Sequence, residues 1–125
     1  MRKDDLKDRT FKFSIDIIDL VELLPKNKAT SVISYQILKS GTSVGANYRA
    51  AKRARSDKEF IVKINIVLEE ADETLFWLEL IKGKKWEIDN PDLFEKLFKE
   101  ANELTAIFTS TLKTMKKKQI LKSNF

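Results

Sequence analysis

Hydrophobic positions recur along most of this chain at steps of three and four residues, the spacing that places side chains on one face of an α-helix. Helix-breaking residues divide this pattern into four segments. The first helix is predicted from about Lys7 to Leu24, and Pro25 ends it because proline lacks a backbone donor and restricts the residue before it. Its predicted core stripe consists of Phe11, Ile15, Ile18, Val21 and Leu24.

The second helix is predicted from about Ala29 to Ala54 or Arg55, although it contains two glycines. Its apolar side consists of Ile33, Ile37, Val44, Tyr48 and Ala51. Gly41 and Gly45 each cost about 1 kcal/mol of helix propensity, so close packing must offset that cost. We expect them to form a shallow face with Ser40, Ala46 and Ala50, on which another helix packs. The competing interpretation of Gly-Thr-Ser-Val-Gly is a phosphate-binding loop, but the lysine that completes such a loop is missing.

Two further helices follow, each with its own start signal. Ser56 and Glu59 have the spacing of a capping box that begins the third helix, and Gly83 is predicted to be its C-terminal cap. Asn90 and Pro91 provide an N-cap and a first-turn proline for the fourth. The third helix has the apolar series Phe60, Ile64, Val67, Leu68, Ala71, Leu75 and Leu78. The fourth has Leu93, Leu97, Ala101, Leu104, Phe108, Leu112 and Met115.

Four amphipathic helices with short links predict an all-α fold, an antiparallel up-down-up-down four-helix bundle formed by residues 1–125 as one domain. A chain of 125 residues can bury a core without disulfides or metals. The absence of cysteine and histidine excludes thiol catalysis, disulfides and histidine-based metal or acid–base chemistry, and we expect no cofactor. The start of the chain has no apolar run typical of a signal sequence, and no apolar run is long enough to span a membrane, which favours a bacterial cytoplasmic protein without membrane contact.

The third helix also has apolar residues on the side away from its core stripe. These are Val62, Ile66, Phe76, Trp77 and Leu80. Contiguous exposed apolar surface usually marks an interface, so we predict a homo-oligomer assembled through this face. The alternative is that a neighbouring loop or terminus covers it.

Positive charge is concentrated in two segments. Around the second link, six cations outnumber Asp57 and Glu59 by four: Arg49, Lys52, Arg53, Arg55, Lys58 and Lys63. Near the C-terminus lie Lys113, Lys116, Lys117, Lys118 and Lys122, which leave the rest of the chain at −4. In an up-down bundle these segments meet at one pole, and such a cluster favours RNA or DNA as a partner. The alternative is that the lysines solvate a helix end and stabilise its dipole.

Two further chemical interpretations concern single residues and acidic pairs. Tyr48 could stack on a base, but its stripe position favours a core residue. All-α nucleoside triphosphate pyrophosphohydrolases hold magnesium with a Glu-Glu-x-x-Glu helix and a second acidic pair, which Glu69, Glu73, Glu100 and Glu103 could imitate. Because Glu69 and Glu73 project away from the expected interior, we favour ion pairing of this acidic run, Glu69 to Glu79, with a neighbouring helix or subunit.

Two motifs carry a family resemblance. The segment Ser40 to Ala51 with Arg53 to Ser56, and the segment Glu69 to Leu80, resemble the four-helix bundle proteins also called 23S ribosomal RNA intervening-sequence proteins. The resemblance implies an antiparallel four-helix bundle without catalytic residues. Related accessory variability determinant proteins of diversity-generating retroelements form pentamers whose basic surface associates with a reverse transcriptase and nucleic acid. Our hypothesis is therefore a non-enzymatic homo-oligomer, a pentamer by resemblance, that binds RNA, DNA or a nucleic-acid-processing protein; the alternative is a scaffold without nucleic-acid contact.

Overall fold

The structure, a computed structural model, describes residues 5–123 and contains four α-helices and no strand in that range. The helices are α1 (Asp5–Leu23), α2 (Lys28–Lys52), α3 (Asp57–Lys84) and α4 (Pro91–Ser123). The prediction of an all-α, four-helix protein is confirmed. The differences lie at the helix ends: α2 ends earlier than expected, and α4 continues well beyond the last predicted stripe residue, Met115.

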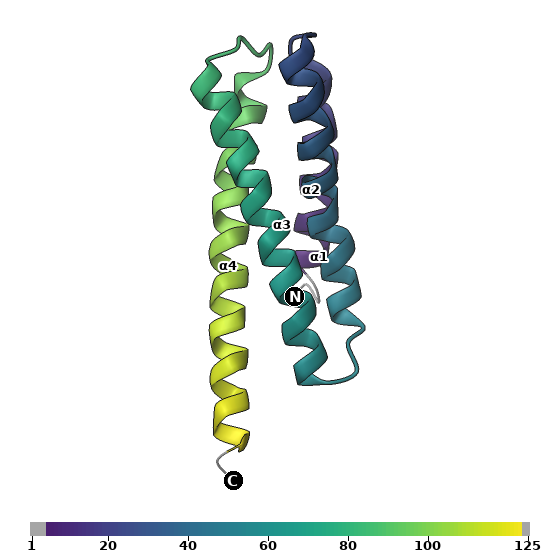
Figure 1. The fold of residues 1–125 in the computed structure, drawn as a ribbon, viewed down its shortest axis with the longest axis vertical. Coiled ribbons are helices and arrows are strands. Elements are labelled where there is room, and N and C mark those ends of the chain that lie inside the picture. Colours follow the sequence, from purple (N-terminus) through teal and green to yellow (C-terminus); the bar gives the residue numbers. More distant parts are fainter. Residues whose placement is uncertain (1–4, 124–125) are drawn as a thin grey trace.

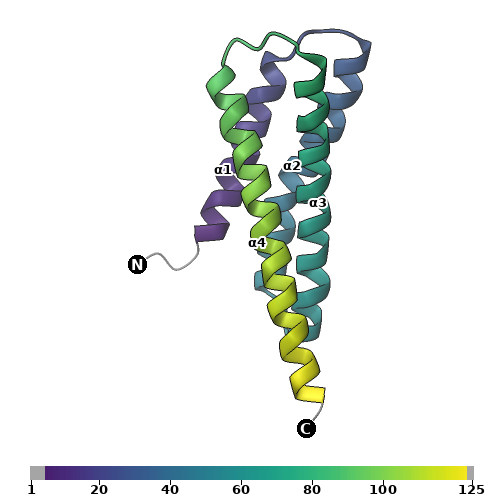
Figure 2. The ribbon, with the colours of Figure 1, turned by 90° about the vertical axis from the view of Figure 1, so that its left-hand side faces the viewer.

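The helices form an elongated bundle in which the α1–α2 and α3–α4 links lie at one end and the α2–α3 link lies at the other (Figure 1, Figure 2). α2 packs between α1 and α3, and α3 packs between α2 and α4, whereas α1 meets α4 over a shorter stretch. Figure 2 shows α1 diverging from α4 toward its N-terminal end. The C-terminal half of α4 instead runs beside α3 and extends past the α2–α3 link (Figure 1).

Helix starts follow the expected capping chemistry. The Leu93 amide donates to the Asn90 side chain over 3.1 Å, so Asn90 is the predicted cap of α4. At α3 the Glu59 amide donates to the Ser56 hydroxyl over 3.1 Å, but the Glu59 carboxylate accepts from the amide of Arg55, one residue before the cap. The predicted capping box is therefore half formed, with its return bond shifted by one residue.

The predicted C-terminal cap of α3 is wrong. Gly83 lies inside the helix, and Lys85 occupies the cap in the left-handed conformation, with φ 57°. The amide of Lys85 donates to the Lys82 carbonyl over 3.1 Å. A left-handed residue at this position satisfies a helix-end carbonyl, and a lysine can adopt it at a modest steric cost.

The core stripes of α2, α3 and α4 follow the prediction, whereas that of α1 does not. Phe11, Ile15 and Ile18 are 61%, 40% and 43% exposed. The stripe that α1 buries is Phe13, Ile17, Leu20 and Leu24. Both sets have helical spacing. Of the predicted stripe, Leu24, just after α1, is buried and Val21 is partly buried against the core. The chain therefore presents an apolar stripe on α1 that the core does not use.

Gly41 and Gly45 lie where α1 crosses α2. A Cβ at Gly41 would be 2.9 Å from Cγ1 of Ile17, and a Cβ at Gly45 would be 3.2 Å from the Thr10 carbonyl oxygen. Both glycines are buried. The prediction of close helix packing is confirmed for the two glycines, whereas Ala46 is exposed and Ser40 is hydrogen-bonded to Thr74 of α3. The interpretation as a phosphate-binding loop is wrong because the segment is helical and α1 covers it.

Candidate nucleic-acid interface

The end of the bundle at the α2–α3 link has the charge that the sequence predicts. Residues 113–123 of α4 lie beside this link because Lys118 and Lys122 pair with Asp57 in the first turn of α3. The two segments together contain eleven Lys and Arg side chains and two carboxylates, which gives a net charge of +9. We call this end the basic pole: Arg49, Lys52, Arg53, Arg55, Lys58, Lys63, Lys113, Lys116, Lys117, Lys118 and Lys122 with Asp57 and Glu59.

Asp57 fastens the two segments of the basic pole together. Its carboxylate accepts from Lys122 over 2.9 Å and lies 3.4 Å from Lys118. The hydrogen bond from Lys122, with the nearby charge of Lys118, holds the pKa of Asp57 below its usual value, so the carboxylate stays ionised.

The predicted nucleic-acid-binding residues do not all share one surface. Lys52 and Arg55 line a hollow of about 380 Å³ at the α2–α3 link, together with Asp57. Arg49 lines a different groove, on the side of α2 that faces α1. Arg53 caps the end of α2, whereas Lys58 and Lys63 lie in the first two turns of α3 and line neither hollow.

Tyr48 belongs to the core. It is 6% exposed, and its ring centroid lies 5.8 Å from that of Phe108. The preference for a core residue over a base-stacking one is therefore confirmed.

The outer face of α3 is apolar, as predicted, but only part of it is open. Val62, Phe76 and Leu80 are 56%, 50% and 39% exposed. Ile66 is half-buried, and Trp77 packs partly against the core. The Trp77 ring meets Phe76 edge-on with centroids 5.0 Å apart. Three of the five predicted interface residues therefore present substantial apolar surface.

The acidic run of α3 lies beside that face and lacks the intramolecular ion pairs that were expected. Within residues 5–123 no salt bridge involves Glu69, Glu70, Asp72, Glu73 or Glu79. Burial raises the pKa of Glu70, and the neighbouring charge of Glu73 adds to this. Within α3 the Trp77 indole donates to the Glu73 carboxylate over 3.2 Å.

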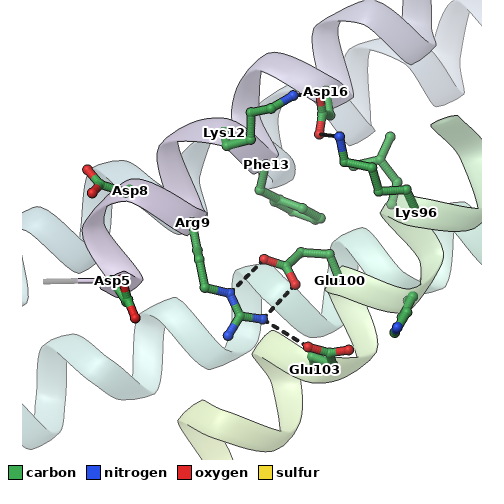
Figure 3. A pocket seen from close by; sticks show the side chains of 11 residues that line it. Asp5, Asp8, Arg9, Lys12, Phe13, Asp16, Lys96, Glu100 and Glu103 are labelled. Atoms are coloured by element: carbon green, nitrogen blue, oxygen red, sulfur yellow. Dashed lines mark hydrogen bonds and ion pairs between the residues drawn. The ribbon is translucent and has the colours of Figure 1, made fainter. Parts of the chain in front are cut away.

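A groove of about 760 Å³ separates α1 from α4 (Figure 3). At one end Asp16, a nearly buried carboxylate, pairs with Lys12 over 2.7 Å and with Lys96 over 3.2 Å. The hydrogen bond from Lys12 to Asp16 raises the pKa of Lys12. Figure 3 shows Asp16 between the two lysines, one from each helix. These contacts hold α1 against α4 where the helices are closest.

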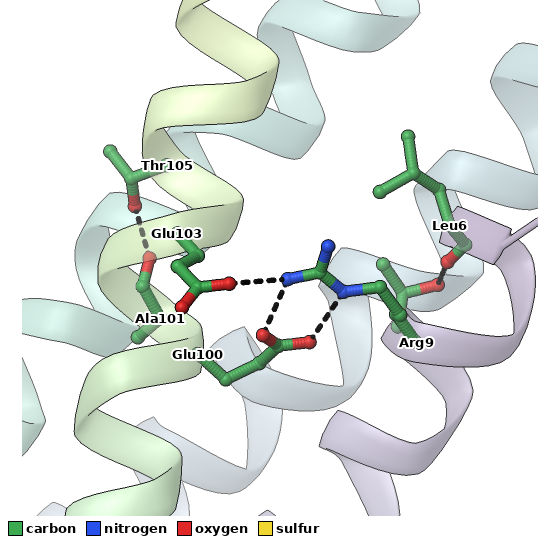
Figure 4. Close-up of polar contacts among 7 residues, drawn as sticks. Leu6, Arg9, Glu100, Ala101, Glu103 and Thr105 are labelled. Carbon is green, nitrogen blue, oxygen red and sulfur yellow. Dashed lines mark hydrogen bonds and ion pairs between the residues drawn. The ribbon is translucent and has the colours of Figure 1, made fainter.

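At the other end of the groove Arg9 reaches from α1 to two carboxylates of α4 (Figure 4). Its Nε and Nη2 donate to Glu100 over 2.9 and 2.6 Å, and Nη2 also donates to Glu103 over 3.1 Å. This forked contact raises the pKa of Arg9. The sequence interpretation did not identify Arg9, because its partner lies 91 residues away.

This fork bears on the magnesium hypothesis. Glu100 and Glu103 are the second acidic pair that it requires, and both accept from Arg9. Among residues 5–123, no group of three or more carboxylates is arranged to hold a metal ion. The groove between α1 and α4 is therefore a set of internal ion pairs. In the same range, none of the four helices has an apolar stretch that could cross a membrane.

Comparison with known proteins finds a family model and solved structures that match this chain. A family model described as 23S rRNA-intervening sequence protein matches residues 2–110. A crystal structure at 1.70 Å resolution, of a protein of unknown function from the S23 ribosomal protein family of Bacteroides thetaiotaomicron VPI-5482, is 37% identical, with a TM-score of 0.75. The match covers 86% of this chain and 97% of that one. No curated protein matches. The family match agrees with the resemblance carried by the motifs of α2 and α3.

Proposed function

Because this chain belongs to the 23S rRNA-intervening sequence protein family, we propose that it is a non-enzymatic, antiparallel helical bundle that binds RNA or DNA through its basic pole. The observation that carries the proposal is the net charge of +9 at that end, set against −4 for the rest of the chain. The pairing of Lys118 and Lys122 with Asp57 supports it, because this contact keeps the α4 lysines beside the first turn of α3, directly after the link that carries Arg53 and Arg55.

The physical basis is counterion release. Each cation that contacts a phosphate releases condensed counterions, so affinity depends steeply on salt and little on sequence. Arginine adds planar, bidentate donors to phosphate. Arg49, Arg53 and Arg55 are all exposed on the last turns of α2 and the link that follows.

We also propose that the protein assembles with copies of itself through the outer face of α3. Val62, Phe76 and Leu80 provide the apolar surface, and the acidic run beside them offers charges to a basic neighbour. The resemblance to accessory variability determinant proteins makes this assembly a pentamer and a reverse transcriptase a candidate protein partner. Its expected location is the cytoplasm.

The test is a salt titration of binding to single-stranded and double-stranded RNA and DNA. We expect a steep slope of log affinity against log salt, and replacing Arg49, Arg53 and Arg55 with alanine should lower it by up to about 3 units. A matched control removes three exposed cations from the opposite end of the bundle, Lys26, Lys28 and Lys84. It should leave the slope nearly unchanged.

Other outcomes would contradict these proposals. If the wild-type protein binds no nucleic acid even at low salt, or if both triple variants bind alike, the basic pole is not an interface and the alternative of a scaffold stands. Light scattering reads the assembly directly, and a monomer would refute the α3 interface. Magnesium-dependent turnover of nucleotides would support the enzyme hypothesis instead.

A further inference from the structure

A second groove, about 220 Å³ in volume, lies on the outer side of α1 and α2 and has a different character from the one between α1 and α4. α1 contributes Lys7 and Phe11, and α2 contributes Thr42, Gly45, Ala46 and Arg49. Two cations and no carboxylate belong to its lining. The exposed guanidinium of Arg49 in this lining favours an anionic ligand, whereas the lining of the α1–α4 groove contains the ion pairs of Arg9 and Asp16.

Phe11 is one of the exposed apolar residues that neither the core nor the basic pole explains. It is a large aromatic side chain that is 61% exposed, and it stands beside a floor of small residues, Gly45 and Ala46. The floor is shallow because α1 and α2 approach so closely that a Cβ at Gly45 would lie 3.2 Å from the carbonyl oxygen of Thr10. A planar ligand can thus lie against the Phe11 ring over Gly45 and Ala46, with the longer Arg49 side chain also in the lining.

We propose that this groove takes one unpaired nucleotide of a strand that is bound at the basic pole, with its base stacked on Phe11 and its phosphate at Arg49. The inference rests on the proposed function and deepens it, because Arg49 belongs to both the groove and the pole. A strand whose phosphates are bound at the basic pole can continue to Phe11 without changing direction. Aromatic stacking tolerates any base, so the groove adds affinity for single strands without sequence specificity.

The residues that line the groove also distinguish a bound nucleotide from a second protein copy. The exposed apolar stripe of α1 continues from Phe11 to Ile15 and Ile18. These two residues are exposed but do not line the groove. A partner helix laid on α1 would contact all three side chains. A nucleotide in the groove would contact Phe11 alone, so Ile18 provides a matched control on the same stripe.

The experiment measures fluorescence anisotropy with two probes, an unpaired oligoadenylate and a blunt duplex with an equal number of phosphates. Phe11→Ala should weaken oligoadenylate binding by about tenfold and leave duplex binding unchanged, because only an unpaired base can stack. The salt slope should not change, since no phosphate contact is lost. Ile18→Ala should bind both probes as the wild type does. Phe11→Trp should retain affinity, and its added fluorescence, measured against the Trp77 and Trp86 background, should be quenched by oligoadenylate.

Other results would overturn the inference in distinguishable ways. If the wild type binds both probes and Phe11→Ala binds oligoadenylate equally well, the nucleotide site is absent while the basic pole still binds nucleic acid. If Phe11→Ala and Ile18→Ala both change the molecular mass in light scattering, α1 is a contact between protein copies. If the wild type binds neither probe, the proposed function itself fails. Circular dichroism confirms that the variants fold, which the exposure of both side chains favours.

Discussion

Replacing Gly41 with alanine should destabilise the fold, although alanine is the better helix former. Gly41 lies in the middle of α2, where the propensity difference alone favours alanine by about 1 kcal/mol. The added methyl group would be 2.9 Å from Cγ1 and 3.0 Å from Cγ2 of Ile17. Ile17 is fully buried and β-branched, so its side chain cannot rotate away without moving its neighbours. Steric cost and propensity therefore oppose each other at this position.

The magnitudes decide the sign. Inserting a methyl group into a well-packed core typically costs about 1–3 kcal/mol. Subtracting the propensity gain of about 1 kcal/mol leaves a net loss of about 0–2 kcal/mol for Gly41→Ala. Gly83 provides the matched control, because it is also helical in α3 but nothing lies within 4 Å of its Cβ position. Gly83→Ala should therefore gain up to about 1 kcal/mol.

Urea unfolding followed by circular dichroism, at one fixed protein concentration, measures both variants. A double variant, Ile17→Ala with Gly41→Ala, provides a further check because the new methyl group then occupies space that Ile17 has vacated. Its loss should be smaller than the sum of the two single losses, by about 0.5 kcal/mol or more. The reasoning is refuted if Gly41→Ala stabilises the protein as much as Gly83→Ala does, or if the two single losses add.

The remaining predictions concern charged groups. Arg9→Gln should lower the free energy of unfolding by about 1 kcal/mol, because it leaves Glu100 and Glu103 side by side without their shared donor. If the difference in unfolding free energy between the variant and the wild type does not shrink in high salt, this reasoning is contradicted. Burial raises the folded-state pKa of Glu70 above its unfolded value, so that group's contribution to stability is retained at acidic pH and lost as pH rises through the folded pKa. Glu70→Gln should then be more stable than the wild type at neutral pH and equal to it at acidic pH, with the exposed Glu79→Gln as control, and melting temperatures across that pH range would measure it.

The sequence was sufficient for the starts of α3 and α4 because these helix starts carry distinct local signals. Ser56, Asn90 and Pro91 act on atoms within three residues of themselves, so the chain alone reveals them. The start of α2 was placed slightly late because its cap, Asn27, works with Thr30, a less familiar capping pair. At the end of α3 the glycine drew the prediction away from Lys85, which adopts the left-handed conformation without being a glycine.

The prediction for α1 failed for a different reason. At about 100° per residue, Phe11 and Phe13 lie on opposite sides of a helix, and each begins an apolar series with helical spacing. Periodicity shows that a helix has an apolar face, but it does not choose between two. The choice is made by α2, whose glycines admit Ile17 and Thr10 at close range. That information lies in the contact between two helices and is absent from either one alone.

The position of the basic pole could be predicted because it depends only on topology. The ion pairs that join its two segments could not be predicted. Placing the end of α4 beside the α2–α3 link requires nothing more than helices that alternate in direction, and the contact of Lys122 with Asp57 confirms that placement. That Asp57 is the partner of Lys118 and Lys122 depends on the positions of the ammonium groups of these long side chains. The same holds for Arg9, which reaches Glu100 across 91 residues of sequence.

The exposed apolar stripe of α1, which we expected to lie in the core, makes the proposed nucleotide groove independent of the proposed self-association through α3. Within the described residues α1 does not pack on α3, so Phe11 and the exposed Val62 and Phe76 belong to different helices that do not touch. Self-association through α3 would leave the groove beside Phe11 open, and a nucleotide in that groove would leave the α3 face free. The two activities should therefore respond to separate substitutions: changes at Phe11 should alter nucleic-acid affinity at constant molecular mass, and polar substitutions at Val62 and Phe76 should alter molecular mass first.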